Sequence, residues 1–243
     1  DFGNDASINN YGTNSFTIEG WFYANSSPAL YEGIFRNGRQ GAFSQVAVQF
    51  NPAGQLSVSV ESTGAGQVDT AGQAVTLNTW HHFAAVIDRP ANQVRLYLDG
   101  GAPVTVASAW GANPISSTDN VLLGAARGST GALLAGNYFD GRIDEIRIWD
   151  HARTLTAILD NMNLAIASAP GLIARWGMDE TSGPTIADSV GTNDGTLVGG
   201  TTWDAAQKPA LGPGTCGYAA VPGCVSCTTA AQCDDSDACT TDT

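Results

Sequence analysis

Apolar and polar residues alternate in short bursts between residues 16 and 149. Successive side chains of a β-strand point to opposite faces, so this period of two indicates half-buried strands of an antiparallel sheet. The bursts occupy residues 16–22, 45–50, 56–60, 82–87, 93–98 and 141–149. Two later segments, residues 172–178 and 195–198, have the same character. The pattern therefore predicts a chain that is rich in β-strands.

Turn-forming residues separate several of these bursts. Residues 51–54, 89–92 and 99–101 combine proline, glycine, asparagine or aspartate. Proline presets φ, whereas glycine and asparagine tolerate positive φ, so such stretches favour tight connections. The strands on either side are therefore predicted to pair as successive hairpins.

One segment has the period of an amphipathic helix instead. Between residues 154 and 167 the apolar side chains of Leu155, Ile158, Leu159 and Met162 recur at helical spacing. Thr154 stands where an N-cap is expected, and residues 170–171, a proline followed by a glycine, would end the segment. The sequence thus predicts one short helix in a chain that is otherwise all-β.

Four segments, in this order along the chain, resemble the laminin-G-like, concanavalin A-like jelly-roll superfamily, in the branch shared with pentraxins and bacterial secreted proteins. They are residues 1–5, 16–21, 79–86 and 139–149, and the resemblance extends over roughly residues 1–203. It implies an antiparallel two-sheet jelly-roll β-sandwich. Bulky side chains that we expect to face inward between the sheets are Trp21, Trp80, Phe83, Tyr97, Ile146 and Ile148.

The order of the segments differs from the arrangement in tandem members of that family. A segment similar to residues 172–203 usually precedes the first strand there, whereas here it comes last. It could fold back beside Asp1 and complete its own sandwich. It could also insert into the next copy of the protein, which would build a head-to-tail polymer.

The charge and the cysteines divide the chain. Ten Lys and Arg against 23 Asp and Glu give a net charge of −13, which makes nucleic-acid binding improbable. No apolar run is long enough to span a membrane.

We expect the sandwich over residues 1–207, a linker over 208–215 and a small disulfide-rich segment over 216–243. This last segment resembles the Cys- and Asp-rich repeats of secreted bacterial proteins.

Five cysteines lie in that last segment, and the body of the chain has none. We expect an exported chain with an extracellular or cell-surface location, and there disulfides are favoured over a zinc site. Because five is odd, one thiol must pair beyond Thr243, pair between molecules or stay free. The five are Cys216, Cys224, Cys227, Cys233 and Cys239.

Catalysis is not expected. Glycoside hydrolases need two carboxylates across a cleft, and the Glu-x-Asp-x-x-Glu strand motif of the best-known family with this fold does not occur. Asp144 and Glu145 form the nearest pair, but neighbouring strand residues point to opposite faces. No nucleophile motif accompanies the three histidines.

A structural Ca²⁺ site is a further expectation, because related jelly rolls often bind Ca²⁺ where a late-strand aspartate meets an early loop. Asp144 has that position, and its partners would be Asp188 or Asn193 together with a backbone carbonyl near Gly38. The alternative for the loop that contains Asp188 is a hydrogen-bonded turn.

Glycan binding needs exposed aromatic rings, and four aromatic residues lie in expected loops or strand ends: Tyr31, Trp110, Tyr138 and Trp203. Capping of the sandwich is the alternative role for these rings. The sequence therefore predicts a non-catalytic extracellular recognition or adhesion module that binds a glycan or an extracellular protein. The competing hypothesis is a structural subunit of an extracellular filament, a homopolymer assembled by strand complementation.

Overall fold

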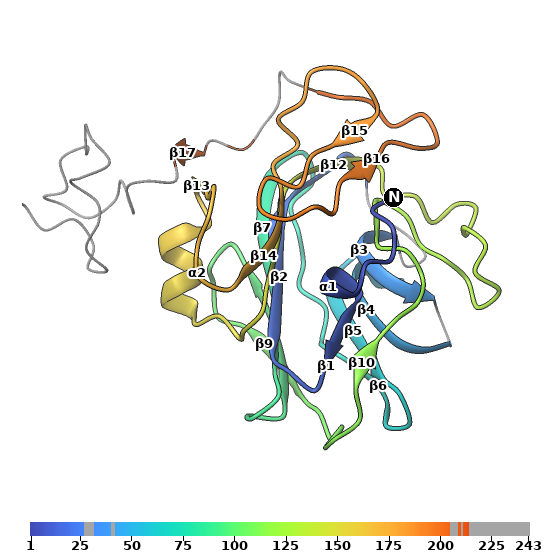
Figure 1. Cartoon of the computed structure of the whole chain (residues 1–243). Helices are drawn as coiled ribbons and strands as arrows, with labels where there is room; N and C mark the ends of the chain where they lie inside the picture. Colours follow the sequence, from blue (N-terminus) through green and yellow to red (C-terminus); the bar gives the residue numbers. More distant parts are fainter. Residues whose placement is uncertain (27–31, 40–41, 205–208, 210, 214–243) are drawn as a thin grey trace, which may run out of the picture.

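Two antiparallel sheets face each other across one apolar core (Figure 1). The computed structural model describes residues 1–26, 32–39, 42–204, 209 and 211–213, so the five cysteines and Tyr31 lie outside the described residues. The six-stranded sheet has the order β14 (Leu172–Trp176), β12 (Gly141–Trp149), β2 (Phe16–Ala24), β7 (Trp80–Asp88), β8 (Gln93–Leu98) and β9 (Val104–Ala107). The five-stranded sheet has the order β11 (Leu122–Leu123), β3 (Gly33–Arg39), β4 (Ala42–Phe50), β5 (Leu56–Ser62) and β6 (Gly66–Asp69). The antiparallel two-sheet sandwich is confirmed.

Short strand pairs and two helices lie around the two sheets. The small strand pairs are β1 (Asn10–Gly12) with β10 (Ile115–Ser116), β15 (Thr185–Ile186) with β16 (Gly195–Thr196), and, in parallel, β13 (Leu164–Ala165) with β17 (Gly212–Pro213). The helices are α1 (Ala6–Asn9) and α2 (Leu155–Asn161). Figure 1 shows α2 on the outer side of the six-stranded sheet, away from the other sheet.

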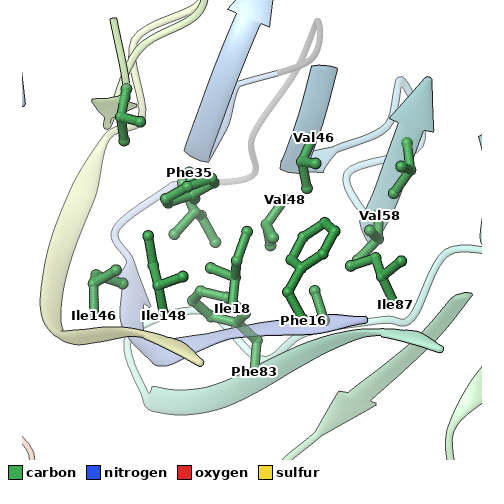
Figure 2. Packing of buried hydrophobic residues seen from close by; sticks show 14 of the residues in the cluster. Phe16, Ile18, Phe35, Val46, Val48, Val58, Phe83, Ile87, Ile146 and Ile148 are labelled. Carbon is green, nitrogen blue, oxygen red and sulfur yellow. The ribbon is translucent and has the colours of Figure 1, made fainter. Parts of the chain in front are cut away.

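The core forms because each strand turns its apolar set inward. On β2 these residues are Phe16, Ile18 and Phe22. Figure 2 shows Phe16 and Ile18 in one cluster with Val48 of β4 and Val58 of β5. Burial of a side chain of this size contributes about 1.5–3 kcal/mol. The predicted hairpins are also present, since β4 pairs with β5, β7 with β8, and β8 with β9.

The inward set differs from the sequence expectation at Tyr97 and at two tryptophans. Tyr97 of β8 packs with Ala84 and with Ile158 of α2 on the outer face of the sheet, while its neighbour Leu96 lies in the main core. Phe83, Ile146 and Ile148 lie in the main core, but Trp21 and Trp80 do not. Because Ile18 and Phe22 point inward, the period of two turns Trp21 to the outer face. Trp80 follows the same rule on β7, three residues before the inward Phe83. The expectation that both rings are core residues is wrong.

The helical prediction is correct in place but too long. Thr154 accepts a hydrogen bond from the backbone N–H of Ala157, as an N-cap does, yet α2 ends at Asn161. Beyond α2, Leu164 and Ile166 both pack on Trp149. These two residues are two positions apart, which is the spacing of a strand and not of a helix. Residues 1–5 are not a strand, and α1 follows them with Asp5 as its N-cap.

The late segment lies against the start of the same chain. β14 pairs with β12 through Ile146 and Trp176, and the ring of Trp176 lies 4.4 Å from that of Phe2. The N–H of Thr196 donates to the carbonyl of Asp1 at 2.8 Å. Donation of this segment to another copy stays a prediction, as do the three domain boundaries. No helix of the described residues is long and apolar enough to cross a membrane.

Candidate functional site

The outer face of the six-stranded sheet carries a row of two aromatic rings and one arginine. The strand register places Tyr23 of β2 opposite both Trp80 of β7 and Arg142 of β12. Antiparallel partners share a face, so the three side chains lie next to one another across the sheet. Each is partly exposed. We call Trp80, Tyr23 and Arg142 the aromatic row.

Close contacts hold the aromatic row in one arrangement. The rings of Tyr23 and Trp80 meet edge to face, with 5.7 Å between centroids and 63° between planes. The guanidinium carbon of Arg142 lies 4.7 Å from the centroid of Tyr23, within cation–π range. Such packing limits rotamer freedom, so the surface is ordered before any ligand arrives.

Polar groups line one end of the aromatic row. Arg142 donates from Nε to Asp204 at 2.8 Å and from Nη1 to Asn25 at 3.2 Å. The amide of Asn25 and the hydroxyl of Ser26 both donate to Asp140, at 3.0 and 2.7 Å. These hydrogen bonds lower the pKa of Asp140 below its ordinary value, so its carboxylate is charged at neutral pH.

The other half of this sheet face is covered by α2 and the residues that follow it. Glu19 is fully buried there and pairs with Arg153 and Arg147, while the indole N–H of Trp149 donates to it at 3.0 Å. Arg153 also donates to the carbonyl of Ala157 in α2 at 2.6 Å. The ion pairs fix α2 on the sheet, and among the described residues of this face the aromatic row stays partly exposed, where it can meet a ligand.

A second buried carboxylate extends this ionic cluster toward β14. Glu145 accepts hydrogen bonds from Arg147 and Arg175, and its side chain is 1% exposed. Glu145 has a positive φ of 50°, at the point where the register between β12 and β2 shifts. The bulge explains how the neighbours Asp144 and Glu145 are both buried on a strand with period-two alternation.

Trp21 and His82 stand between the aromatic row and the covered half. Their rings lie 5.3 Å apart, and the indole N–H of Trp21 donates to the carbonyl of Met162 at 2.8 Å. His82 is 1% exposed, and within the described part of the chain neither of its ring nitrogens has a hydrogen-bond partner. Burial lowers the pKa of His82 to about 4, against opposing effects of Glu19 and Asp99.

This buried histidine predicts acid lability. Between pH 6.5 and about 4 the unfolded chain binds a proton at His82 that the folded chain does not, so the free energy of unfolding falls as the pH falls. The expected loss is about 3 kcal/mol over that window. Urea unfolding at several pH values measures it. The loss should shrink in His82→Leu and persist in His151→Gln, which changes an exposed histidine; equal pH slopes for His82→Leu and the native chain would contradict the assignment.

Asp188 and Asn193, two of the residues expected to hold calcium, lie in contact and are hydrogen-bonded to each other. Asp188 accepts from the backbone N–H groups of Arg175, Val190, Gly191 and Asn193 and from the Asn193 amide. Burial raises the pKa of Asp188, but these donors outweigh it and the pKa is lowered. The geometry is that of a hydrogen-bonded turn, the alternative the sequence left open for this loop.

The other two calcium candidates lie on strands of the two sheets. Asp144 is buried on β12 opposite Trp21, and Gly38 lies on β3 in the five-stranded sheet. Among the described residues there is no group of three or more His, Cys, Asp or Glu side chains that could hold a metal ion. Calcium binding by Asp144 with Asp188 or Asn193 and a backbone carbonyl near Gly38 stays a prediction.

The aromatic residues expected to bind a ligand have different environments. Trp110 is 2% exposed and belongs to the main core, so its expected exposure is wrong. Tyr138 is 51% exposed, and Trp203 is partly buried with its indole N–H on the carbonyl of Gly183. Each precedes, by one or two residues, an aspartate that borders the aromatic row. Tyr31 is outside the described residues.

Sequence reasoning missed all three members of the aromatic row. The signal was present in the alternation, since an inward Phe22 requires an outward Tyr23. The pairing of Tyr23 with Trp80 and Arg142 joins residues 57 and 119 positions apart, which only the sheet register reveals.

A polar hollow of about 570 Å³ is lined by residues that do not belong to the aromatic row. Its lining residues are Asn4, Ala6, Asn10, Arg39, Thr63, Ser116, Ser117, Thr118 and Asp119. Arg39 and Asp119 pair with each other across it. The lining has no aromatic ring, and its charged groups are already matched, so the aromatic row is the stronger candidate site.

Comparisons with known proteins agree with this architecture. A family model described as the concanavalin A-like lectin/glucanases superfamily matches residues 3–159. A putative carbohydrate-binding protein from Bacteroides ovatus is 21% identical with a TM-score of 0.57, covering 74% of this chain and 50% of its own. This chain therefore spans half the length of that protein. No curated protein matches.

Two further solved structures are similar at lower scores. One is the heptameric SAP-like pentraxin from Limulus polyphemus, 17% identical with a TM-score of 0.45, covering 58% of this chain and 66% of its own. The other is the CBM40 module of the Ruminococcus gnavus IT-sialidase bound to α2,6-sialyllactose, 19% identical with a TM-score of 0.48, covering 63% of this chain and 87% of its own.

Proposed function

This chain belongs to the concanavalin A-like lectin/glucanase superfamily, and from that premise we propose that it is a non-catalytic glycan-binding module whose ligand lies on the aromatic row. The observation that carries the proposal is the ordered, partly exposed pair of Tyr23 and Trp80 beside the Arg142 guanidinium. Aromatic rings offer a large apolar area at little cost in conformational entropy, and the apolar C–H faces of sugar rings pack against such area.

The polar rim supports the same ligand class. Sugar hydroxyls are both donors and acceptors, and beside the rings they would meet the carboxylates of Asp140 and Asp204 and the amide of Asn25. A few placed polar groups next to an apolar platform are the usual make-up of a small-ligand site. The similarity to a putative carbohydrate-binding protein is consistent with this proposal.

The proposal excludes catalysis because of where the carboxylates lie. Glycoside hydrolysis needs two carboxyl groups facing the scissile bond. Asp144 and Glu145 are both buried, and Glu145 is committed to Arg147 and Arg175. The carboxylates of the rim, Asp140 and Asp204, are bound to the donors that hold the site together.

Binding of oligosaccharides by the full chain tests the proposal. Trp80→Ala and Tyr23→Ala should each weaken binding at least about tenfold, because central aromatic residues dominate interface energies. Leu133→Ala removes an exposed apolar side chain outside the aromatic row and should leave affinity unchanged. Isothermal titration measures all four proteins after their thermal midpoints are compared. Equal affinity of native protein and both ring variants would refute the site.

We further propose that the module acts outside the cell or on its surface, as the cluster of cysteines in residues 216–243 suggests. Light scattering at several protein concentrations tests the filament hypothesis. The particle mass of a homopolymer would rise with concentration, whereas that of a glycan-binding monomer would stay constant.

A further inference from the structure

We infer that the glycan bound on the aromatic row is neutral, not acidic; this deepens the proposed function and rests on it. The inference starts from Arg142, the guanidinium of the aromatic row. An acidic sugar would normally be recognised by such a group through two parallel N–H···O bonds. Whether Arg142 is available for that role decides which class of glycan fits.

Arg142 is already matched by the protein itself. Its Nε donates to Asp204 at 2.8 Å, its Nη1 donates to Asn25, and its face lies against Tyr23. The Arg142 and Asp204 side chains are 26% and 40% exposed, so the ion pair lies within reach of a ligand at this surface. An incoming carboxylate would have to displace Asp204 from the guanidinium of Arg142.

The surrounding charge also opposes an anion. Asp140, held by Asn25 and Ser26, adds a second carboxylate, so the described rim residues carry two carboxylates and the one guanidinium of Arg142. The whole chain carries a net charge of −13. Like charges brought together at an interface weaken binding and slow the encounter.

A neutral, hydroxyl-rich ligand meets none of these costs. Its hydroxyl groups can donate to the rim carboxylates in charge-assisted hydrogen bonds while its C–H face packs on Tyr23 and Trp80. The Arg142–Asp204 pair then serves to hold Tyr23 in place and to present an acceptor, and it need not break. The charges around the aromatic row therefore favour neutral sugars over acidic ones.

Titration of the full chain with two sets of probes tests the inference. The neutral set is tetrasaccharides of β-linked glucose, xylose and mannose, and the acidic set is a tetragalacturonide and sialyllactose. Neutral binding should be at least about tenfold tighter and unchanged between about 50 mM and about 500 mM NaCl, because no charged ligand is screened. Tighter binding of an acidic probe that weakens with salt would overturn the inference and leave the proposed function intact. No binding of any probe by the folded chain would refute the proposed function itself.

A charge variant tests the role of Asp204 directly. Asp204→Asn releases Arg142, so affinity for the tetragalacturonide should rise about tenfold over the native chain. Asp150→Asn changes the net charge equally at the opposite end of β12 and should give no such rise. An equal response of the two variants would contradict the account of Arg142, since it would assign the effect to overall charge alone.

Discussion

Replacement of Glu19 by glutamine is expected to lower the free energy of unfolding by about 3–5 kcal/mol, because it leaves the buried guanidinium of Arg153 without its carboxylate, whereas Arg147 keeps Glu145. Burial would raise the pKa of Glu19, but Arg153 and Arg147 lower it, so the group is ionised in the folded chain. Glutamine keeps the shape and loses the charge. Arg153, whose side chain is 2% exposed, then has a buried charge opposite a neutral amide.

Chemical denaturation with a near-ultraviolet signal measures this loss. Asp179→Asn is the matched control, because Asp179 also pairs with an arginine of the cluster, Arg175, but its side chain is 68% exposed. Exposed pairs contribute little, so this control should stay close to the native chain. A Glu19→Gln variant as stable as the control would contradict the view that ion pairs fix α2 on the sheet.

Replacement of Trp176 by alanine is expected to cost a similar amount, about 3–5 kcal/mol, through loss of a large buried ring. Trp176 is fully buried, packs against Phe2 and donates its indole N–H to the carbonyl of Asn193 at 2.8 Å. Its removal opens a cavity and also leaves that carbonyl without its donor. Both effects act on the segment that follows β12 and α2.

Equilibrium unfolding in urea compares Trp176→Ala with Trp176→Phe. The phenylalanine variant keeps most of the ring and loses only the hydrogen bond, so it should cost about 1–2 kcal/mol. A loss below about 1 kcal/mol for the alanine variant would mean that Trp176 is not packed in the core of its own chain in solution. That outcome would favour donation of the late segment to another copy.

The strands and hairpins were predictable because their signals are local. The structure gives β8 and β12 the same bounds as the alternation did, Gln93–Leu98 and Gly141–Trp149. The hairpin after β4 follows from residues 51–54, where Gly54 has a φ of 70°. Period two and turn chemistry each act over a few residues, which a single sequence displays in full.

The candidate site was not predictable in the same way because it is assembled across strands. The size of Trp21 and Trp80 suggests core residues. Their outward orientation follows only once Ile18, Phe22 and Phe83 are known to point inward, because side chains alternate along a strand. Short strands escaped as well, since β10 and β13 have two residues each and carry no visible period. The ionic cluster under α2 joins residues more than 100 positions apart, such as Glu19 and Arg153.

The most direct test of the glycan-binding account is an NMR titration of the full chain with the neutral tetrasaccharide that it binds most tightly. The account predicts that the indole N–H of Trp80 and the backbone amides around Tyr23 and Arg142 shift together, with one dissociation constant. Shifts confined to the polar hollow around Arg39 and Asp119 would contradict it, and so would a spectrum that stays unchanged with every oligosaccharide tested.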